Sequence, residues 1–226
     1  MKIAVLGTGT VGRTMASAFG KLGHEVTVGT RDPSSTMART DPDAMGNPPY
    51  SAWAREHPEV ALAAFAEAAR GAELVVNATS GASSITALEA AGADNLAGKI
   101  LLDIANPLDF SRGMPPSMFV KDTDSLAEQI QRSFPTVRVV KALNTMTAAL
   151  MVDPELVSGG DSTTFVSGDD QPAKKTVTEL LSALGHRDII DLGDITTARG
   201  TEMLLPIWLR LMGALGTPMF NFKIVR

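Results

Sequence analysis

The chain has 226 residues, 44% of them hydrophobic and 20% charged, which is typical of a globular protein with one or two domains. Its 25 acidic residues outnumber its 20 Lys and Arg, and the net charge of −5 disfavours nucleic-acid binding. With no cysteine and only 3 His, the chain offers no disulfide, and we expect no metal site. No apolar run could span a bilayer and strand-like sequence starts at Lys2, so we expect a cytoplasmic protein without a membrane partner.

The N-terminal half alternates strands with helices. The continuous apolar run 3–6 predicts a buried strand, the apolar spacing over 11–22 predicts a helix, and 25–29 predicts a second strand. Residues 32–51 contain four prolines and no apolar period, so we expect a long loop with at most a helical turn. The elements expected next are helix 60–70, strand 73–77, helix 84–91, strand 99–104, helix 124–133 and strand 137–141.

The alternation continues in the C-terminal part, after a softer stretch near 146–161. Strands that alternate with helices predict an α/β fold with a doubly wound, mostly parallel sheet. We expect a Rossmann domain over 1–146 and a smaller C-terminal α/β domain over 147–226. The C-terminal elements expected are strand 163–167, helix 172–184, strand 188–191 and a last helix over 197–215.

The last predicted helix is apolar on most of its circumference. A helix of that kind is expected to be buried. We expect it to belong to the core or to a homodimer interface, or to form the floor for a planar ligand, with a kink at Pro206.

A glycine-rich turn joins the first predicted strand to the first predicted helix and reads G-x-G-x-x-G. The first glycine permits a tight turn, the second lets the backbone approach a pyrophosphate, and the third lets helix and strand pack closely. The free N–H groups at the helix N-terminus favour an anion. The predicted dinucleotide-binding turn consists of Gly7, Thr8, Gly9, Thr10, Val11 and Gly12.

The end of the second predicted strand distinguishes NADP from NAD. An NAD site usually has an acidic residue there, which holds the ribose 2′-hydroxyl, whereas this chain has Thr30 and Arg31. A hydroxyl and a guanidinium suit a 2′-phosphate, so we expect NADP(H) as cofactor. Arg31 could instead be solvated or pair with Asp32, and Arg39 is a weaker candidate for the same phosphate.

Small or amide-bearing side chains follow three later strands. In open α/β sheets the ligand lies beyond the carboxyl ends of the strands, so these residues suit contacts with the nicotinamide and its ribose. Asn, Ser and Thr also favour ordinary turns, so the alternative is that these residues only form turns and bind no ligand. The cofactor-binding residues expected at these strand ends are Ala78, Thr79, Ser80, Asn106, Pro107, Leu143 and Asn144.

No catalytic residue can be assigned from the sequence. A carbonyl or alcohol dehydrogenase needs a proton donor or acceptor at the substrate oxygen, and none stands out. Lys141 follows a strand and could be catalytic, but we expect it to be structural or to bind phosphate. Hydride exchange between two heterocyclic cofactors needs no such group, because the protein mainly stacks the rings in register.

Several stretches resemble the family of NADPH-dependent coenzyme F420 reductases. The resemblance covers nearly the whole chain, and the related cytosolic domain of metalloreductases that pass hydride from NADPH to a flavin has a similar pattern. The stretches that carry it are 2–9, 23–31, 140–145, 166–170 and the end at Phe222 and Lys223.

The resemblance implies a Rossmann domain with a smaller C-terminal part, usually assembled as a homodimer. It implies reversible hydride transfer between NADPH and coenzyme F420, an 8-hydroxy-5-deazaflavin. On matching positions it implies that Thr8, Thr10 and Val11 line the pyrophosphate, Thr30 and Arg31 the 2′-phosphate, and residues 78–80 with Leu143 and Asn144 the nicotinamide.

Three hypotheses on function therefore stand side by side. The first is hydride transfer between NADPH and coenzyme F420 or another flavin-like ring. The second is NADP-dependent reduction of a small carbonyl or imine, assisted by Lys141 or Asn144. The third is a non-catalytic NADP(H)-binding sensor. The lack of a clear acid–base group counts against the second.

Overall fold

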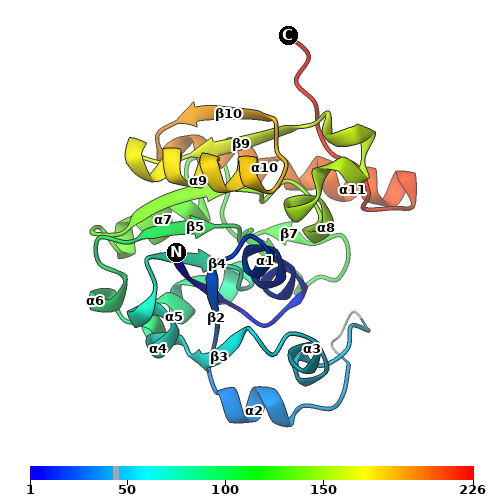
Figure 1. The fold of residues 1–226 in the computed structure, drawn as a ribbon. Coiled ribbons are helices and arrows are strands. Elements are labelled where there is room, and N and C mark those ends of the chain that lie inside the picture. Colours follow the sequence, from blue (N-terminus) through cyan, green and yellow to red (C-terminus); the bar gives the residue numbers. More distant parts are fainter. Residues whose placement is uncertain (43–45) are drawn as a thin grey trace.

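An eight-stranded sheet runs through the computed structural model, which describes residues 1–42 and 46–226 (Figure 1). The strand order is β10-β9-β8-β5-β4-β1-β2-β3, and every neighbouring pair is parallel except β8 with β9. The predicted doubly wound α/β fold of Rossmann type is thereby confirmed. The strands are β1 Lys2–Leu6, β2 Glu25–Thr30, β3 Ala61–Ala64, β4 Leu74–Asn77, β5 Ile100–Asp103, β8 Arg138–Ala142, β9 Thr163–Ser167 and β10 Asp188–Gly193.

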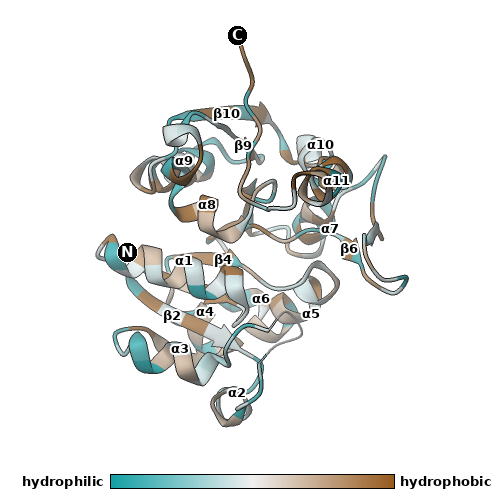
Figure 2. Ribbon diagram, turned by 90° about the vertical axis from the view of Figure 1, so that its right-hand side faces the viewer, coloured by the Kyte–Doolittle hydropathy of each residue, from teal (hydrophilic) through white to brown (hydrophobic). Residues whose placement is uncertain are grey.

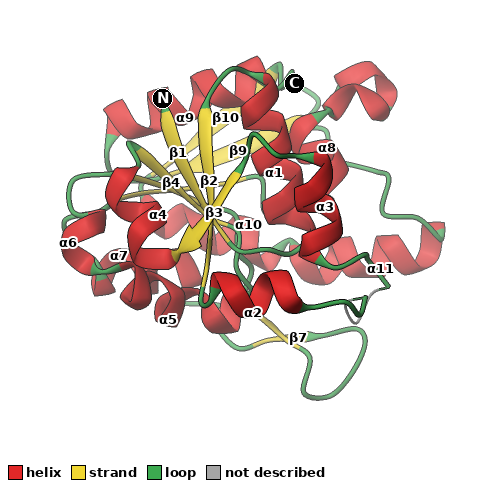
Figure 3. Ribbon diagram, turned by 60° about the horizontal axis from the view of Figure 1, so that its bottom comes forward, coloured by secondary structure: helices red, strands yellow, loops and turns green. Residues whose placement is uncertain are grey.

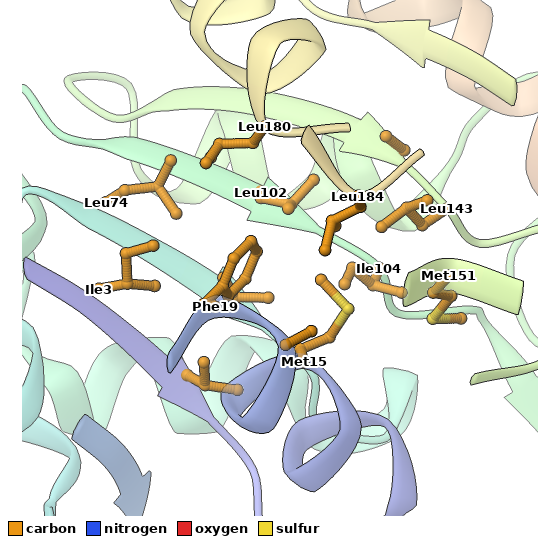
Figure 4. Packing of buried hydrophobic residues seen from close by; sticks show 14 of the residues in the cluster. Ile3, Met15, Phe19, Leu74, Leu102, Ile104, Leu143, Met151, Leu180 and Leu184 are labelled. Carbon is orange, nitrogen blue, oxygen red and sulfur yellow. The ribbon is translucent and has the colours of Figure 1, made fainter. Parts of the chain in front are cut away.

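Helices bury both faces of this sheet. Successive residues of a strand point to opposite faces, so Ile3 packs in one apolar cluster, with Phe19 and Leu180 (Figure 4). Its neighbour Ala4 packs in a second cluster, with Leu88. Phe19 is fully buried, a contribution of about 2–3 kcal/mol. The first face carries α1 Thr10–Lys21, α8 Ala148–Val152 and α9 Gln171–Ala183; the second carries α4 Phe65–Gly71, α5 Gly81–Ala91, α6 Ala93–Leu96, α7 Leu126–Ser133 and α10 Ala198–Met203.

The prediction of a long loop over 32–51 is wrong in part. Two short helices, α2 Pro33–Ala38 and α3 Tyr50–Glu56, occupy its ends (Figure 3), and residues 43–45 lie outside the described residues. Asp32 caps α2, because its carboxylate accepts hydrogen bonds from the backbone N–H and the hydroxyl of Ser35. This capping signal is present in the sequence, but the prolines around it obscure it.

The predicted helix over 60–70 is also wrong at its start. Residues 61–64 form β3, which pairs with β2, and only the following residues continue as the helix α4. Alanine and leucine favour a helix locally, so pairing with β2 overrides the local preference of this stretch.

The last predicted helix is two helices, and the second of them, the apolar one, is mostly not buried. α10 ends at Met203, and α11 Leu205–Leu215 follows after Leu204, with Pro206 in its first turn as expected near a break. Within α11 only Leu205 is buried, whereas Ile207 is 48% exposed and Leu215 is 56% exposed. Figure 2 shows α11 as a strongly hydrophobic element on the outside of the fold. Core packing therefore does not explain its apolar composition.

The predicted boundary between residues 146 and 147 separates β8 from β9, where the sheet changes from parallel to antiparallel. Both parts nevertheless share one sheet, and the division into two domains stays a prediction. A small antiparallel hairpin, β6 Leu108–Asp109 with β7 Ser117–Met118, follows β5 and was not predicted. None of the described helices is long and apolar enough to cross a membrane.

Candidate functional site

The glycine-rich turn has the geometry that its sequence predicts. Gly7 has a φ of +122°, and a Cβ atom there would lie 2.5 Å from the backbone oxygen of Ala78. A Cβ at Gly12 would lie 2.1 Å from the oxygen of Gly7, so neither position accepts a side chain. At Gly9, by contrast, a Cβ would meet nothing within 4 Å, so the middle of the turn faces open space.

The N-terminus of α1 lies next to this open space. Gly9 is its N-cap and supplies no side-chain hydrogen bond, so no side chain caps the first N–H groups of the helix. The backbone oxygen of Thr8 is held by the guanidinium of Arg13 at 2.8 Å, which fixes the outer edge of the turn. This helix end fits the pyrophosphate predicted for NADP(H). Its N–H groups are uncapped, its dipole end is positive, and Gly9 leaves space for the phosphates.

At the end of β2, Thr30 and Arg31 differ in their surroundings. Thr30 is buried and its hydroxyl lies 2.9 Å from that of Thr36. Arg31 is exposed and makes no ion pair within the described parts of the chain. Asp32 is not its partner, because hydrogen bonds from Ser35 engage the carboxylate and lower its pKa. The guanidinium of Arg31 thus remains available to a 2′-phosphate, whereas the hydroxyl of Thr30 is already shared with Thr36.

A cavity of about 870 Å³ opens beyond the carboxyl ends of β4, β5 and β8, next to the glycine-rich turn. It brings together predicted residues from four segments of the chain, as expected for a Rossmann-type sheet. Its size suits a cofactor-sized ligand. The predicted residues that line it are Thr10, Val11, Ala78, Thr79, Ser80, Asn106 and Asn144.

Asn106 and Asn144 hold one another across the cavity floor. Asn106 donates from its side-chain nitrogen to the backbone oxygen of Asn144 at 2.8 Å, and Asn144 donates back to Oδ1 of Asn106 at 3.0 Å. Asn144 also donates to the backbone oxygen of Thr201 in α10 at 3.1 Å. This pairing fixes the loops after β5 and β8 relative to each other and ties both to α10.

Pro107 and Leu143 lie beside the cavity but do not line it. Pro107 accepts a hydrogen bond from the backbone N–H of Phe119 at 3.0 Å, which anchors the β6–β7 hairpin. Leu143 is buried and has a φ of +62°, a strained conformation for a side chain of this size. This residue turns the chain sharply at the end of β8, so that Asn144 faces Asn106.

Lys141 is enclosed in the protein and does not line the cavity. It is fully buried, and its Nζ lies 2.8 Å from Asp103 and 2.9 Å from Glu202 and donates to the backbone oxygen of Ala105. Burial alone would lower the pKa of Lys141, but the two carboxylates outweigh it and raise that pKa. These contacts favour the structural role expected for Lys141, because they leave no exposed ammonium for a phosphate or a substrate.

Sequence reasoning missed most of the apolar and aromatic wall of the cavity. Trp208 of α11 belongs to the last predicted helix, which the sequence offered as a possible floor for a planar ligand, and Leu205 of the same helix also lines the cavity. Trp208 stacks on Phe220, with ring centroids 5.3 Å apart, and its indole N–H is buried without a hydrogen-bond partner among the described residues. The residues for which the sequence gave no signal are Phe110, Phe119, Met146 and Met151, because only the fold brings them together.

One comparison matches the N-terminal part of the chain and another matches all of it. The family model of NADP oxidoreductase, coenzyme F420-dependent, matches residues 2–107. The crystal structure of a candidate F420-dependent NADP reductase from Arthrobacter sp. FB24 is 69% identical, covers 100% of both chains and superposes with a TM-score of 0.97.

Two curated relatives are more distant. The chain is 27% identical over 217 residues to the F420-dependent NADP reductase of Methanothermobacter thermautotrophicus, covering 93% of this chain and 89% of that protein. It is 32% identical over 213 residues to the rat metalloreductase STEAP3. That alignment covers 92% of this chain but 38% of the rat protein, so the chain spans well under half the length of this relative.

Proposed function

Because the chain belongs to the family of coenzyme F420-dependent NADP oxidoreductases, we propose that it transfers a hydride between NADP(H) and coenzyme F420 or a related flavin-like ring. This membership confirms the resemblance found in the sequence. At the level of the family, it also confirms the prediction of an NADP-dependent oxidoreductase. The identity of the acceptor is the part that this proposal adds.

The observation that carries the proposal is the composition of the cavity wall. A cavity of about 870 Å³ with aromatic and aliphatic side chains on its outer side can hold a second planar ring against a nicotinamide. NADP(H) and a deazaflavin supply the hydride chemistry when bound. The protein contributes the stacking surface of Trp208 and the strand-end loops that fix the position of a ring.

The titratable groups of the cavity argue against reduction of a carbonyl or imine. Asp109 is the one ionisable side chain among the described residues of the lining. The backbone N–H of Ser111 donates to its carboxylate at 2.9 Å and lowers its pKa, so Asp109 is ionised and cannot protonate a substrate oxygen at neutral pH. Lys141 is enclosed in its ion pairs, and Asn144 offers an amide that does not release protons.

The amide of Asn144 suits a binding role instead. Its nitrogen already donates to Asn106 and Thr201, and its oxygen takes part in no described hydrogen bond. A carbonyl oxygen held in this way can accept a hydrogen bond from an amide of a bound ligand. We assign Asn144 to orientation of the nicotinamide end, and Thr10, Val11 and Arg31 to the phosphates, as predicted from the sequence.

A spectroscopic assay tests the proposed reaction. The purified protein is mixed with NADPH and oxidised coenzyme F420, and loss of the visible absorbance of the deazaflavin is followed, with NADH and a simple flavin in parallel. We expect rapid bleaching with NADPH and slow or no bleaching with NADH. If only the flavin is reduced, the acceptor is a flavin and not coenzyme F420. Tight binding of NADPH without reduction of either ring would favour a non-catalytic NADP(H)-binding sensor.

We also propose that a second copy of this chain covers the exposed apolar side of α11. Ile207, Leu215 and Met219 are 48%, 56% and 38% exposed, respectively, on neighbouring parts of the C-terminal segment. Sedimentation should give a dimer that Ile207→Lys weakens, whereas a monomeric wild type contradicts this part of the proposal. The predicted cytoplasmic location likewise stays a prediction.

A further inference from the structure

A buried network of charged and polar groups lies below the cavity. Its centre is Lys141, whose ammonium is bound by Asp103 from β5 and by Glu202 from α10 at 2.8 and 2.9 Å. All three side chains are almost completely buried. Buried charges persist in a fold only when they are paired and hydrogen-bonded, so these contacts constrain the relative positions of β5, β8 and α10.

On one side this network reaches the loops that carry the cofactor-binding residues. The carboxylate of Asp103 accepts a hydrogen bond from the side-chain nitrogen of Asn77 at 2.8 Å. The side-chain oxygen of Asn77 in turn accepts from the hydroxyl of Thr79 at 2.7 Å, and Thr79 lines the cavity. Lys141 itself donates to the backbone oxygen of Ala105, another lining residue.

On the other side the network reaches the outer wall. Glu202 lies in the last turn of α10, three and six residues before Leu205 and Trp208, which line the cavity. Besides its contact with Lys141, its carboxylate accepts the backbone N–H groups of Leu126 and Ala127, at 2.8 and 3.1 Å. These contacts fix Glu202 in one orientation, at the point where α10 leads into α11.

From these contacts we infer that Glu202 is a positioning residue. Through Lys141 it sets the separation between the Trp208 wall and the loops after β4 and β5, and thus the space for the second ring. The inference rests on the proposed function, because hydride transfer between two stacked rings needs this separation to be held closely. Glu202 touches neither ring, so its loss should affect the acceptor more than NADP(H).

The chain offers a matched control for a merely structural role. Arg199 of α10 donates to Glu128 of α7 at 2.8 Å, so this ion pair joins the same two helices without touching Lys141. Arg199→Met should loosen the contact between α10 and α7 but leave the tie from Glu202 to Lys141 in place. Glu202→Asp keeps the negative charge on a shorter side chain. It replaces Glu202→Gln as the test variant if Glu202→Gln does not fold.

The experiment reads the position of α11 from the fluorescence of Trp208. The chain has 2 tryptophans, so Trp53→Phe leaves Trp208 as the sole reporter. In that background we expect Glu202→Gln to shift the Trp208 emission to the red and to increase its quenching by acrylamide. The KM for coenzyme F420 should rise about tenfold, with the Kd for NADPH changed less than twofold, and Arg199→Met should show none of these changes.

A double variant tests whether Glu202 acts through Lys141. Lys141→Met with Glu202→Gln should raise the KM no further than the worse single variant, since both break the same link. Equal effects of Arg199→Met, additive effects in the double variant, or a rise in the NADPH Kd as large as that in the KM would overturn the inference. If the wild type reduces no deazaflavin, the proposed function fails, while the Trp208 signal still reports whether Glu202 holds α11.

Discussion

The two halves of the candidate site are built in different ways. The dinucleotide half uses backbone, with a turn of glycines, a helix N-terminus and one exposed arginine that are all close in the sequence. The acceptor half uses side chains from the loops after β4, β5 and β8, from the β6–β7 hairpin and from α11, which are distant in the sequence. A site formed by backbone groups needs few residues, but those residues tolerate few substitutions. A site formed by side chains can acquire a different ligand when the side chains that line it are substituted.

The strongest test of the backbone half is Gly12→Ala. A Cβ at 2.1 Å from the oxygen of Gly7 forces α1 away from the turn, which should cost about 3 kcal/mol, at the upper end of the overpacking range. We expect the Kd for NADPH to rise more than about tenfold. Denaturant unfolding and NADPH fluorescence measure the two effects.

Gly20→Ala is the matched control on the same helix. A Cβ at Gly20 meets nothing within 4 Å, so alanine should stabilise α1 by about 0.5–1 kcal/mol without changing NADPH binding. Similar losses in the two variants would show that glycine content of α1, and not the fit of the turn, governs its stability.

The second prediction concerns the cofactor specificity of the same half. Arg31→Ala should raise the Kd for NADPH about 10–100-fold, as expected for loss of a charged hydrogen bond worth about 1.5–3 kcal/mol, and leave that for NADH unchanged. Titrations with both nucleotides provide the measurement. Arg39→Ala is the comparison variant. A larger rise in the Kd for NADPH in Arg39→Ala, or equal rises for NADPH and NADH in Arg31→Ala, would contradict the assignment of the 2′-phosphate to Arg31.

The third prediction addresses the acceptor half. Trp208→Ala removes the stacking surface of the cavity wall, so the KM for the acceptor should rise about tenfold, or about 1.4 kcal/mol. The Kd for NADPH should stay nearly constant. Leu192→Ala removes an exposed apolar side chain of β10 that does not line the cavity, and steady-state kinetics should show no change in the KM. Equal effects of the two variants would contradict the stacking role.

The smallest predicted effect lies outside both halves and concerns pH. The two terminal nitrogens of the Arg132 guanidinium donate to Asp124, at 2.9 and 2.8 Å, and this lowers the pKa of Asp124 from 3.8 to about 2. A lowered carboxyl pKa stabilises the fold above about pH 4, and that contribution is lost as the pH falls towards about 2.

Arg132→Gln should therefore destabilise the protein at pH 7 and much less at pH 2. Because the Arg132 side chain is 59% exposed, we expect only about 0.5–1 kcal/mol. Thermal unfolding at both pH values measures it, with Lys175→Gln, at an exposed ion pair of 3.9 Å, as the control. A loss for Arg132→Gln that is the same at both pH values would contradict the assignment to Asp124.

Local signals explain which parts of the fold were predictable. Ser125 and Glu128 have the spacing of a capping box, a local signal for the start of α7, and their side chains bond at 2.8 Å. The alanines of 61–64 gave no such signal, because strand pairing with β2 is a tertiary contact. The apolar composition of α11 was visible, but its burial was mistaken, since hydrophobicity does not tell core from interface or ligand wall.

For the site, sequence by itself determined the glycine turn, the residues at the end of β2 and the polar strand ends. Each depends on short-range backbone geometry or on the rule that ligands lie beyond the carboxyl ends of parallel strands. Only the tertiary structure decided the role of Lys141 and the partners Asp103 and Glu202. Glu202 lies 61 residues after Lys141 in the sequence. A buried charge takes its function from whichever opposite charge the fold places beside it, and no local pattern records that choice.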